Sequence, residues 1–124
     1  LSSYLEIGEP QRAIPVLEAS ERDLPGDYNP PARLAVAYRE MKDYGRALAA
    51  SDRAVAKAYG PRRLGILRTR ARIQAESGDR AAARATLEST IAEAQALPAG
   101  QVSERTLSAI RLELAPYLTP TALP

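Results

Sequence analysis

The residues of this chain with the most scope for chemistry are arginines, and many of them gather in one stretch. Between Arg53 and Ala75 there is no Asp or Glu, and the interval carries seven basic residues: Arg53, Lys57, Arg62, Arg63, Arg68, Arg70 and Arg72. The whole chain has a formal net charge of only +2. A stretch this basic can bind carboxylates or phosphates. It can equally be ordinary helix surface, where arginine stems cover apolar neighbours and the guanidinium groups stay in water.

Residues able to carry catalysis are scarce. The sequence has no His and no Cys, which removes the usual base, the thiolate nucleophile and the commonest metal ligands. Ser51 precedes Asp52 and Ser20 precedes Glu21, but adjacent pairs of this kind are common on helix surfaces. The glycines are scattered, so no loop could cradle a phosphate, and the carboxylates lack metal-site spacing. We therefore predict that the chain is not an enzyme and has no cofactor or metal site.

The elements that must position the arginines are helices. Clusters of Gly, Pro, Asp and Asn mark turns, and the segments between them are rich in Ala, Leu and Arg. No alternation of apolar and polar residues is long enough for a strand. The sequence predicts helices at residues 2–7, 10–22, 31–41, 44–58, 62–77, 80–97 and 104–115.

Several helix ends carry their own signals. Pro31 and Pro61 suit the first turn of a helix, where a backbone N–H has no partner in any case. Asp79 and Ser103 are predicted N-caps, and Val102 with Leu107 has the spacing of a hydrophobic staple. Pro15 does not fit, because inside a helix it removes a hydrogen bond.

The chain also overlays on itself. A shift of 34 residues places Tyr4 on Tyr38 and Ala13 on Ala47, and a shift of 36 places Ala47 on Ala83. The same shifts place Ser20 on Ala54 and Ala54 on Thr90. A period of this length with two helices in each unit indicates a helical solenoid.

These positions resemble the tetratricopeptide repeat family, whose pattern sets small and aromatic residues at fixed places on two helices. The middle unit matches at Pro31, Leu34, Ala35, Tyr38, Tyr44, Ala47, Ser51 and Ala54. The first unit matches at Leu1, Tyr4, Gly8, Ala13, Leu17, Ser20 and Pro25, and the third at Leu67, Ala71, Gly78, Ala83, Leu87 and Thr90. The family tryptophan is missing, Lys42 holds its usual glycine position, and Gln74 and Arg70 replace its tyrosine and leucine in the third unit.

The resemblance implies an all-α fold, an α-solenoid with a right-handed superhelix. We expect one repeat domain at residues 1–116, with units at about 1–27, 28–61 and 62–98, a capping helix at 103–116 and a flexible tail at 117–124. Arg70 falls on the face expected to pack. The register of the third unit therefore stays open, with Ile66 and Ile73 as the alternative buried stripe.

By the same resemblance, the function is protein–protein interaction, with first helices lining a concave groove for a partner segment. Helical spacing places the groove residues on two helices: Asn29, Arg33, Val36 and Glu40 on one, and Arg68, Thr69 and Arg72 on the other. Three arginines in this set favour an acidic protein or peptide partner. Some family members clamp a terminal carboxylate, but the matching positions here hold Ala32 and Val36, so that clamp is not supported.

Other readings stay open. The chain begins with Leu1 and not Met, so we expect it to belong to a longer protein. An alternative function is that of an accessory domain in an enzyme whose catalytic part lies outside this chain. Nucleic acid is a further candidate, although Tyr59 is the only aromatic residue near the basic stretch. No apolar run is long enough for a membrane span. Fifteen of the 17 basic residues are arginine, which suggests a bacterial source. The open end of a solenoid could also bind a second copy of the chain.

Overall fold

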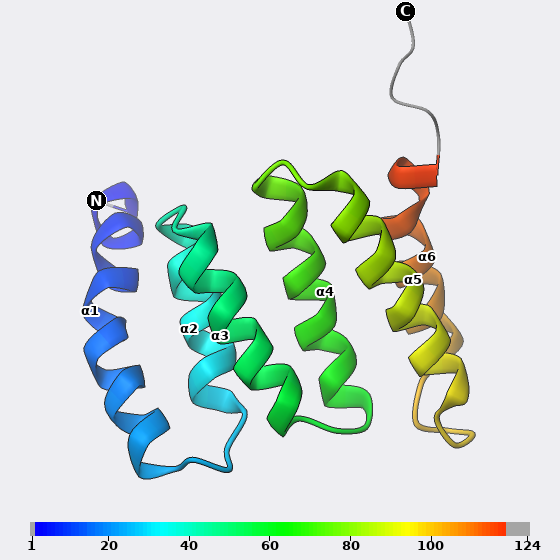
Figure 1. The fold of residues 1–124 in the computed structure, drawn as a ribbon, viewed down its shortest axis with the longest axis horizontal. Helices are drawn as coiled ribbons and strands as arrows, with labels where there is room; N and C mark the ends of the chain where they lie inside the picture. The colour runs from blue at the N-terminus through cyan, green and yellow to red at the C-terminus, as the bar shows by residue number, and fades with distance from the viewer. Residues whose placement is uncertain (1, 119–124) are drawn as a thin grey trace, which may run out of the picture. The chain divides into compact units, whose positions relative to one another are not determined.

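The computed structural model describes residues 2–118, with side chains from residue 10 onward. Over that range it consists of six α-helices and no strand, so the prediction of an all-α chain is confirmed. The helices are α1 (Ser2–Asp23), α2 (Asn29–Glu40), α3 (Tyr44–Lys57), α4 (Pro61–Glu76), α5 (Arg80–Ala96) and α6 (Glu104–Leu118) (Figure 1). Leu1 and residues 119–124 of the predicted tail lie outside the described residues, as does the side chain of Tyr4.

The helices fall into two compact units, Leu1–Tyr59 and Gly60–Pro124. In the first unit α1 packs against α2, and α2 packs against α3. In the second unit α4 packs against α5, and α5 packs against α6. Each unit is thus built from helices that follow one another along the chain.

Two predicted helix boundaries are wrong. A break was predicted at residues 7–10, but α1 runs without interruption from Ser2 to Asp23 and holds Pro10 and Pro15 inside it. A proline keeps a helical φ and loses a single hydrogen bond, and Pro15 is exposed, so water can hydrate the carbonyl left without its donor. The predicted tail began at residue 117, but α6 continues past Pro116 to Leu118.

Small residues form the core of the first unit. On α3, Ala47, Ala50 and Ala54 are all 0% exposed, and on α2 both Leu34 and Ala35 are buried. Alanine lets two helices approach closely, since a longer side chain at these positions would force them apart.

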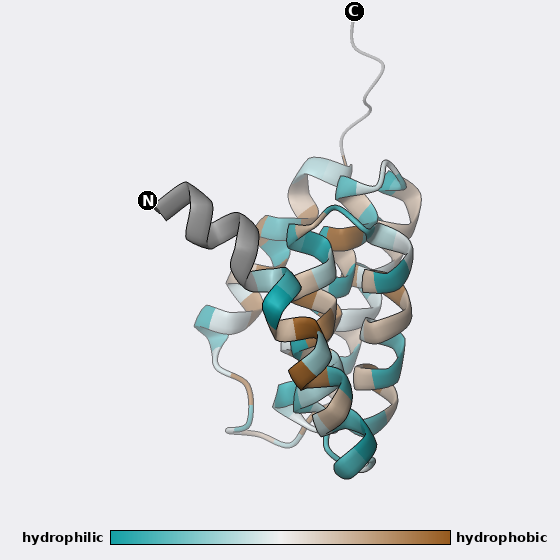
Figure 2. Cartoon of the chain, turned by 90° about the vertical axis from the view of Figure 1, so that its left-hand side faces the viewer, coloured by the Kyte–Doolittle hydropathy of each residue, from teal (hydrophilic) through white to brown (hydrophobic). Residues whose placement is uncertain are grey.

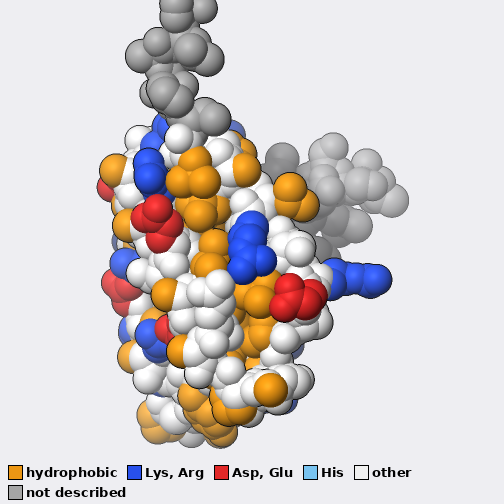
Figure 3. Space-filling view, turned by 90° about the vertical axis from the view of Figure 1, so that its right-hand side faces the viewer, with side chains coloured by type: hydrophobic (Ala, Val, Ile, Leu, Met, Phe, Trp, Pro, Cys, Tyr) orange, Lys and Arg blue, Asp and Glu red, His pale blue; other side chains and the backbone are white. Residues whose placement is uncertain are grey.

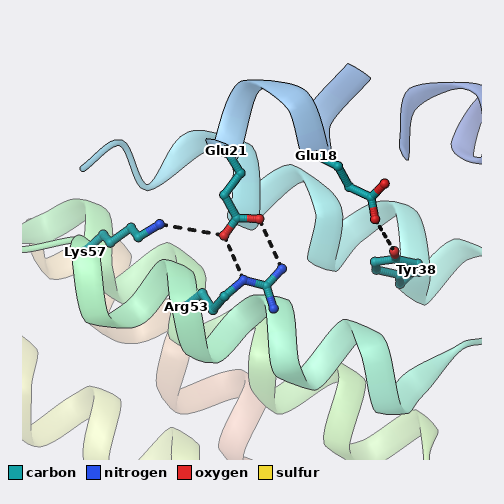
Figure 4. Close-up of polar contacts among 5 residues, drawn as sticks. All are labelled: Glu18, Glu21, Tyr38, Arg53 and Lys57. Atoms are coloured by element: carbon teal, nitrogen blue, oxygen red, sulfur yellow. Dashed lines mark hydrogen bonds and ion pairs between the residues drawn. The ribbon is translucent and has the colours of Figure 1, made fainter. Parts of the chain in front are cut away.

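Tyr38 is the large residue of this core. It is buried, and its hydroxyl donates a hydrogen bond of 3.4 Å to Oε2 of Glu18 on α1 (Figure 4). Burial, followed by the nearby Glu18 carboxylate, raises the pKa of Tyr38. The ring therefore fills space in the core while its hydroxyl reaches a polar partner.

The second unit has two apolar clusters. Ala71, Leu87, Ile110 and Leu114 form one, against which Ile91 and Tyr117 pack. Leu64, Ala94 and Leu107 form the other, against which Leu97 and Val102 pack. Val102 therefore packs against the cluster that contains Leu107, in keeping with the predicted staple at the start of α6.

The predicted N-caps are also confirmed. Oγ of Ser103 accepts a hydrogen bond from the Thr106 N–H at 3.1 Å, and the Asp79 carboxylate accepts one from the Ala82 N–H at 3.0 Å. Pro61 is the first residue of α4. Each of these signals acts within one helical turn, which is why the sequence alone could reveal it.

The α2–α3 and α4–α5 turns are built alike, 36 residues apart. The Asp43 N–H donates to the Tyr38 carbonyl at 2.8 Å, and the Asp79 N–H donates to the Gln74 carbonyl at 2.9 Å. Both aspartates then cap the following helix. The residue before each aspartate has a positive φ, 63° at Lys42 and 97° at Gly78.

Helix α4, which corresponds to the helix predicted at residues 62–77, is buried on more than one side. Ile66 and Ile73, the alternative stripe, are buried, and so are Leu67 and Ala71, which match the repeat pattern. Arg70 lies partly exposed and has an interaction partner. Both proposed stripes of α4 are therefore buried, and Arg70 sits at their edge.

None of the helices within residues 2–118 combines the length and apolar character needed to cross a membrane. In the part of α1 that Figure 2 colours, hydrophobic and hydrophilic residues are interspersed along the helix.

Candidate functional site

The exposed face of α2 carries the first set of predicted groove residues. Asn29, Arg33, Val36 and Glu40 are all exposed, whereas Leu34 between them is buried. Val36 is 40% exposed, which is high for an apolar side chain on a helix whose other face is core. Asn29 is tied locally, because its backbone and side-chain N–H groups both donate to Oδ1 of Asp27. This face presents one apolar side chain flanked by charges of both signs.

The second predicted set lies on α4, and the structure gives its members partners within the chain. Nε and Nη2 of Arg68 donate to the two carboxylate oxygens of Glu113 on α6, at 2.9 and 2.6 Å. Arg72 lies 3.7 Å from the same carboxylate. Oγ1 of Thr69 donates to the Gly65 carbonyl at 3.2 Å. Arg68 and Arg72 are thus brought together on one acid, and Thr69 is turned to its own helix.

The Arg68–Glu113 contact is a two-bond pair between helices. The hydrogen bonds that Arg68 donates to the Glu113 carboxylate raise the pKa of Arg68, against the effect of partial burial. Its side chain is 28% exposed and that of Glu113 is 30% exposed. Arg68 is consequently a tie between α4 and α6, which the sequence could not show because Glu113 lies 45 residues away.

The other end of the basic stretch has the same arrangement. Nε and Nη2 of Arg53 donate to the Glu21 carboxylate at 2.7 and 3.2 Å, and Nζ of Lys57 lies 3.6 Å from it (Figure 4). The hydrogen bond from Arg53 lowers the pKa of Glu21. On α4, Arg63 lies 2.8 Å from Glu93 of α5.

Carboxylates from outside the basic stretch therefore neutralise much of it. Glu21, Glu93 and Glu113 each come from another helix of the same unit, and together they pair with five basic side chains: Arg53, Lys57, Arg63, Arg68 and Arg72. A stretch of sequence without acidic residues therefore need not form a strongly basic surface, because folding brings glutamates from other helices beside its arginines.

A depression in the second unit adds residues that the sequence did not single out. Arg68, Ala71 and Arg72 of α4, Leu87 of α5, and Glu113 and Tyr117 of α6 line a volume of about 140 Å³. The guanidinium carbon of Arg80 lies 4.8 Å from the centre of the Tyr117 ring, and Nη2 of Arg80 donates to the Pro116 carbonyl at 2.9 Å. Glu113 and Tyr117 are one turn apart on α6, which is the signal that could have linked them.

α6 also exposes two large apolar side chains, Leu112 at 74% and Leu118 at 51%. In the view of Figure 3, hydrophobic side chains on the outward face are broken up by basic, acidic and polar ones. Single exposed apolar residues of this kind are normal on protein surfaces, so they do not define a binding site.

Among the serines that precede an acidic residue, Ser51 is 0% exposed, and its hydroxyl donates to the Leu48 carbonyl at 2.8 Å. Within the described residues no three acidic side chains gather closely enough to hold a metal ion. No known family model, curated protein or solved structure matches this chain.

Proposed function

We propose that this chain is a helical-repeat module of the tetratricopeptide type that binds a segment of a partner protein. In this reading α2–α3 and α4–α5 are successive repeats of a right-handed solenoid, and α6 begins or caps the next. The first helices of the repeats would offer preformed contacts, so that little ordering is needed when the partner binds.

The observation that carries this proposal is the repeated turn. Two helical hairpins share the same pattern of backbone hydrogen bonds, a residue with positive φ and a capping aspartate, at an interval of 36 residues. The buried small residues Ala47 and Ala83 recur at the same interval, both 0% exposed. Recurrence at this spacing is typical of stacked two-helix repeats.

Nucleic-acid binding is less well supported. Phosphate binding draws on free basic side chains. Here three arginines of the basic stretch, Arg53, Arg63 and Arg68, already lie within hydrogen-bond distance of carboxylates of the same unit.

A peptide-display selection on the intact chain tests the proposal. The double variant R33E/V36E alters the exposed face of α2, and its matched control, R12E/V16E, makes the same two changes at exposed positions of α1. We expect wild-type chain to select peptides whose binding weakens by about tenfold or more in the α2 variant and is kept in the control. Circular dichroism checks that both variants stay folded. Failure to select any peptide, or equal losses in both variants, would contradict the proposal.

A further inference from the structure

The depression between α4 and α6 has one basic group that the fold leaves available. Arg68 is committed to Glu113 through two short hydrogen bonds. Arg72 lies 3.7 Å from the same carboxylate, which is too long for a hydrogen bond, and its side chain is 50% exposed. Arg72 can therefore donate to a second carboxylate without breaking the tie between the helices.

The charged side chains that line the depression have a net charge of +1. Two arginines share a single carboxylate, so the three groups together are positive. One added carboxylate neutralises this sum, whereas a phosphate dianion would overshoot it beside Glu113. The charge thus favours a carboxylate over a phosphate.

Apolar surface lies beside Arg72. Ala71 and Leu87, each 3% exposed, contribute to the lining, and Tyr117 packs against the cluster that contains them. The volume of about 140 Å³ is that of roughly four to five water molecules in the liquid. A short aliphatic side chain can enter such a space while a neighbouring carboxylate meets Arg72.

We propose that this depression binds an acidic residue, Asp or Glu, that stands next to a short aliphatic residue in the partner segment. The carboxylate accepts hydrogen bonds from the Arg72 guanidinium, and the aliphatic side chain covers Leu87 and Tyr117. Glu113 keeps Arg68 in place and excludes more highly charged anions. This inference rests on the proposed function and narrows it to one kind of partner sequence.

An NMR titration of the labelled full chain tests it with two capped probe peptides. The first is Gly-Ser-Leu-Glu-Leu-Ser-Gly, and the second has Gln in place of Glu. We expect the Glu peptide to shift the Arg72 side-chain N–H and the Tyr117 amide, and to bind about tenfold more tightly than the Gln peptide. The variant R72Q should abolish this difference. The matched control R111Q, at an exposed position two residues before Glu113 and so on the opposite side of α6, should retain it.

Four outcomes would overturn the inference. Equal binding of the two peptides would show that the carboxylate is not recognised, and absence of any shift at Arg72 would show that the depression is not used. Inorganic phosphate that displaces the Glu peptide and binds more tightly would make the depression a phosphate site. Shifts confined to Arg33 and Val36 on α2 would refute this inference while supporting the proposed function.

Discussion

Lys42 and Gly78 occupy the same place in two turns, each one residue before a capping aspartate and each with a positive φ. The left-handed region is open to glycine and costs an L-residue about 1–2 kcal/mol. In the α2–α3 turn, therefore, a lysine adopts the left-handed conformation that a glycine adopts in the α4–α5 turn. Lys42 stores strain that its counterpart avoids.

Replacing Lys42 by glycine should stabilise the chain. We expect K42G to raise the free energy of unfolding by about 0.5–1 kcal/mol, because relief of the left-handed strain outweighs the greater freedom of glycine in the unfolded chain. Urea unfolding followed by circular dichroism measures the change. The reciprocal variant G78K should destabilise the chain by about 1 kcal/mol, because a lysine would have to adopt the positive φ of Gly78. A Cβ at this position would meet no atom within 4 Å, so no steric clash adds to that cost. A loss of stability in K42G would show that the lysine side chain makes a stronger contact than its backbone costs.

Enlarging Ala47 should disrupt the packing of α2 on α3. Ala47 is 0% exposed, so A47L inserts three carbons where no space is free, and we expect a loss of about 1–3 kcal/mol. The control A49L places the same side chain at an exposed position of the same helix and should change the melting temperature little. Unchanged melting of A47L would mean that the helices can separate at no cost.

The Glu21 carboxylate should make the stability of the first unit depend on acid pH. Its pKa in the folded chain lies below the ordinary value of 4.5, chiefly because of the hydrogen bond from Arg53. The contribution of Glu21 is therefore complete above about pH 4.5 and is lost as the pH falls through the lowered folded-state value.

Glu21→Gln removes this dependence. We expect E21Q to be about 1 kcal/mol less stable than wild type at pH 7, a figure kept small because the Arg53 side chain is 45% exposed and screened by water. The two proteins should converge as the pH falls through the lowered pKa of Glu21. E88Q, which alters a one-turn surface pair with Arg84, is the control and should leave the pH profile nearly unchanged. Parallel profiles for E21Q and wild type would rule out the pair as the cause.

The tie between Arg68 and Glu113 can be measured by a double-mutant cycle. The variants R68Q, E113Q and their combination should give a coupling energy of about 1 kcal/mol, weaker in high salt. The exposed pair Arg84–Glu88 is the comparison and should give about 0.3–0.5 kcal/mol. A coupling near zero for Arg68 and Glu113 would mean that the helices are held by apolar contacts alone.

The helices could be predicted because their signals are local. Asp79, Ser103 and Pro61 each act within one turn, and the structure uses all three where the sequence places them. The continuity of α1 could not be predicted in this way. Pro10 and Pro15 read locally as interruptions, and the gain that offsets their lost hydrogen bonds comes from packing against α2.

The candidate site was predicted only in part, because some of its residues are distant from one another in the sequence. Helical spacing identified Arg68 and Arg72 as neighbours, but Glu113 and Tyr117 join them only when α6 folds back beside α5. Glu21 reaches Arg53 across 32 residues in the same way. The charge of a surface depends on such distant partners, so it cannot be deduced from one stretch of the sequence.

The most extensive packing in each unit joins helices that follow one another along the chain, and from this we predict an order of folding. Contacts of low sequence separation close short loops, so the α2–α3 and α4–α5 hairpins can assemble rapidly and without waiting for distant segments. The ties from Glu21 to Arg53 and from Glu113 to Arg68 span a whole intervening helix and can close only afterwards. We therefore expect loss of either ion pair to speed unfolding more than it slows folding.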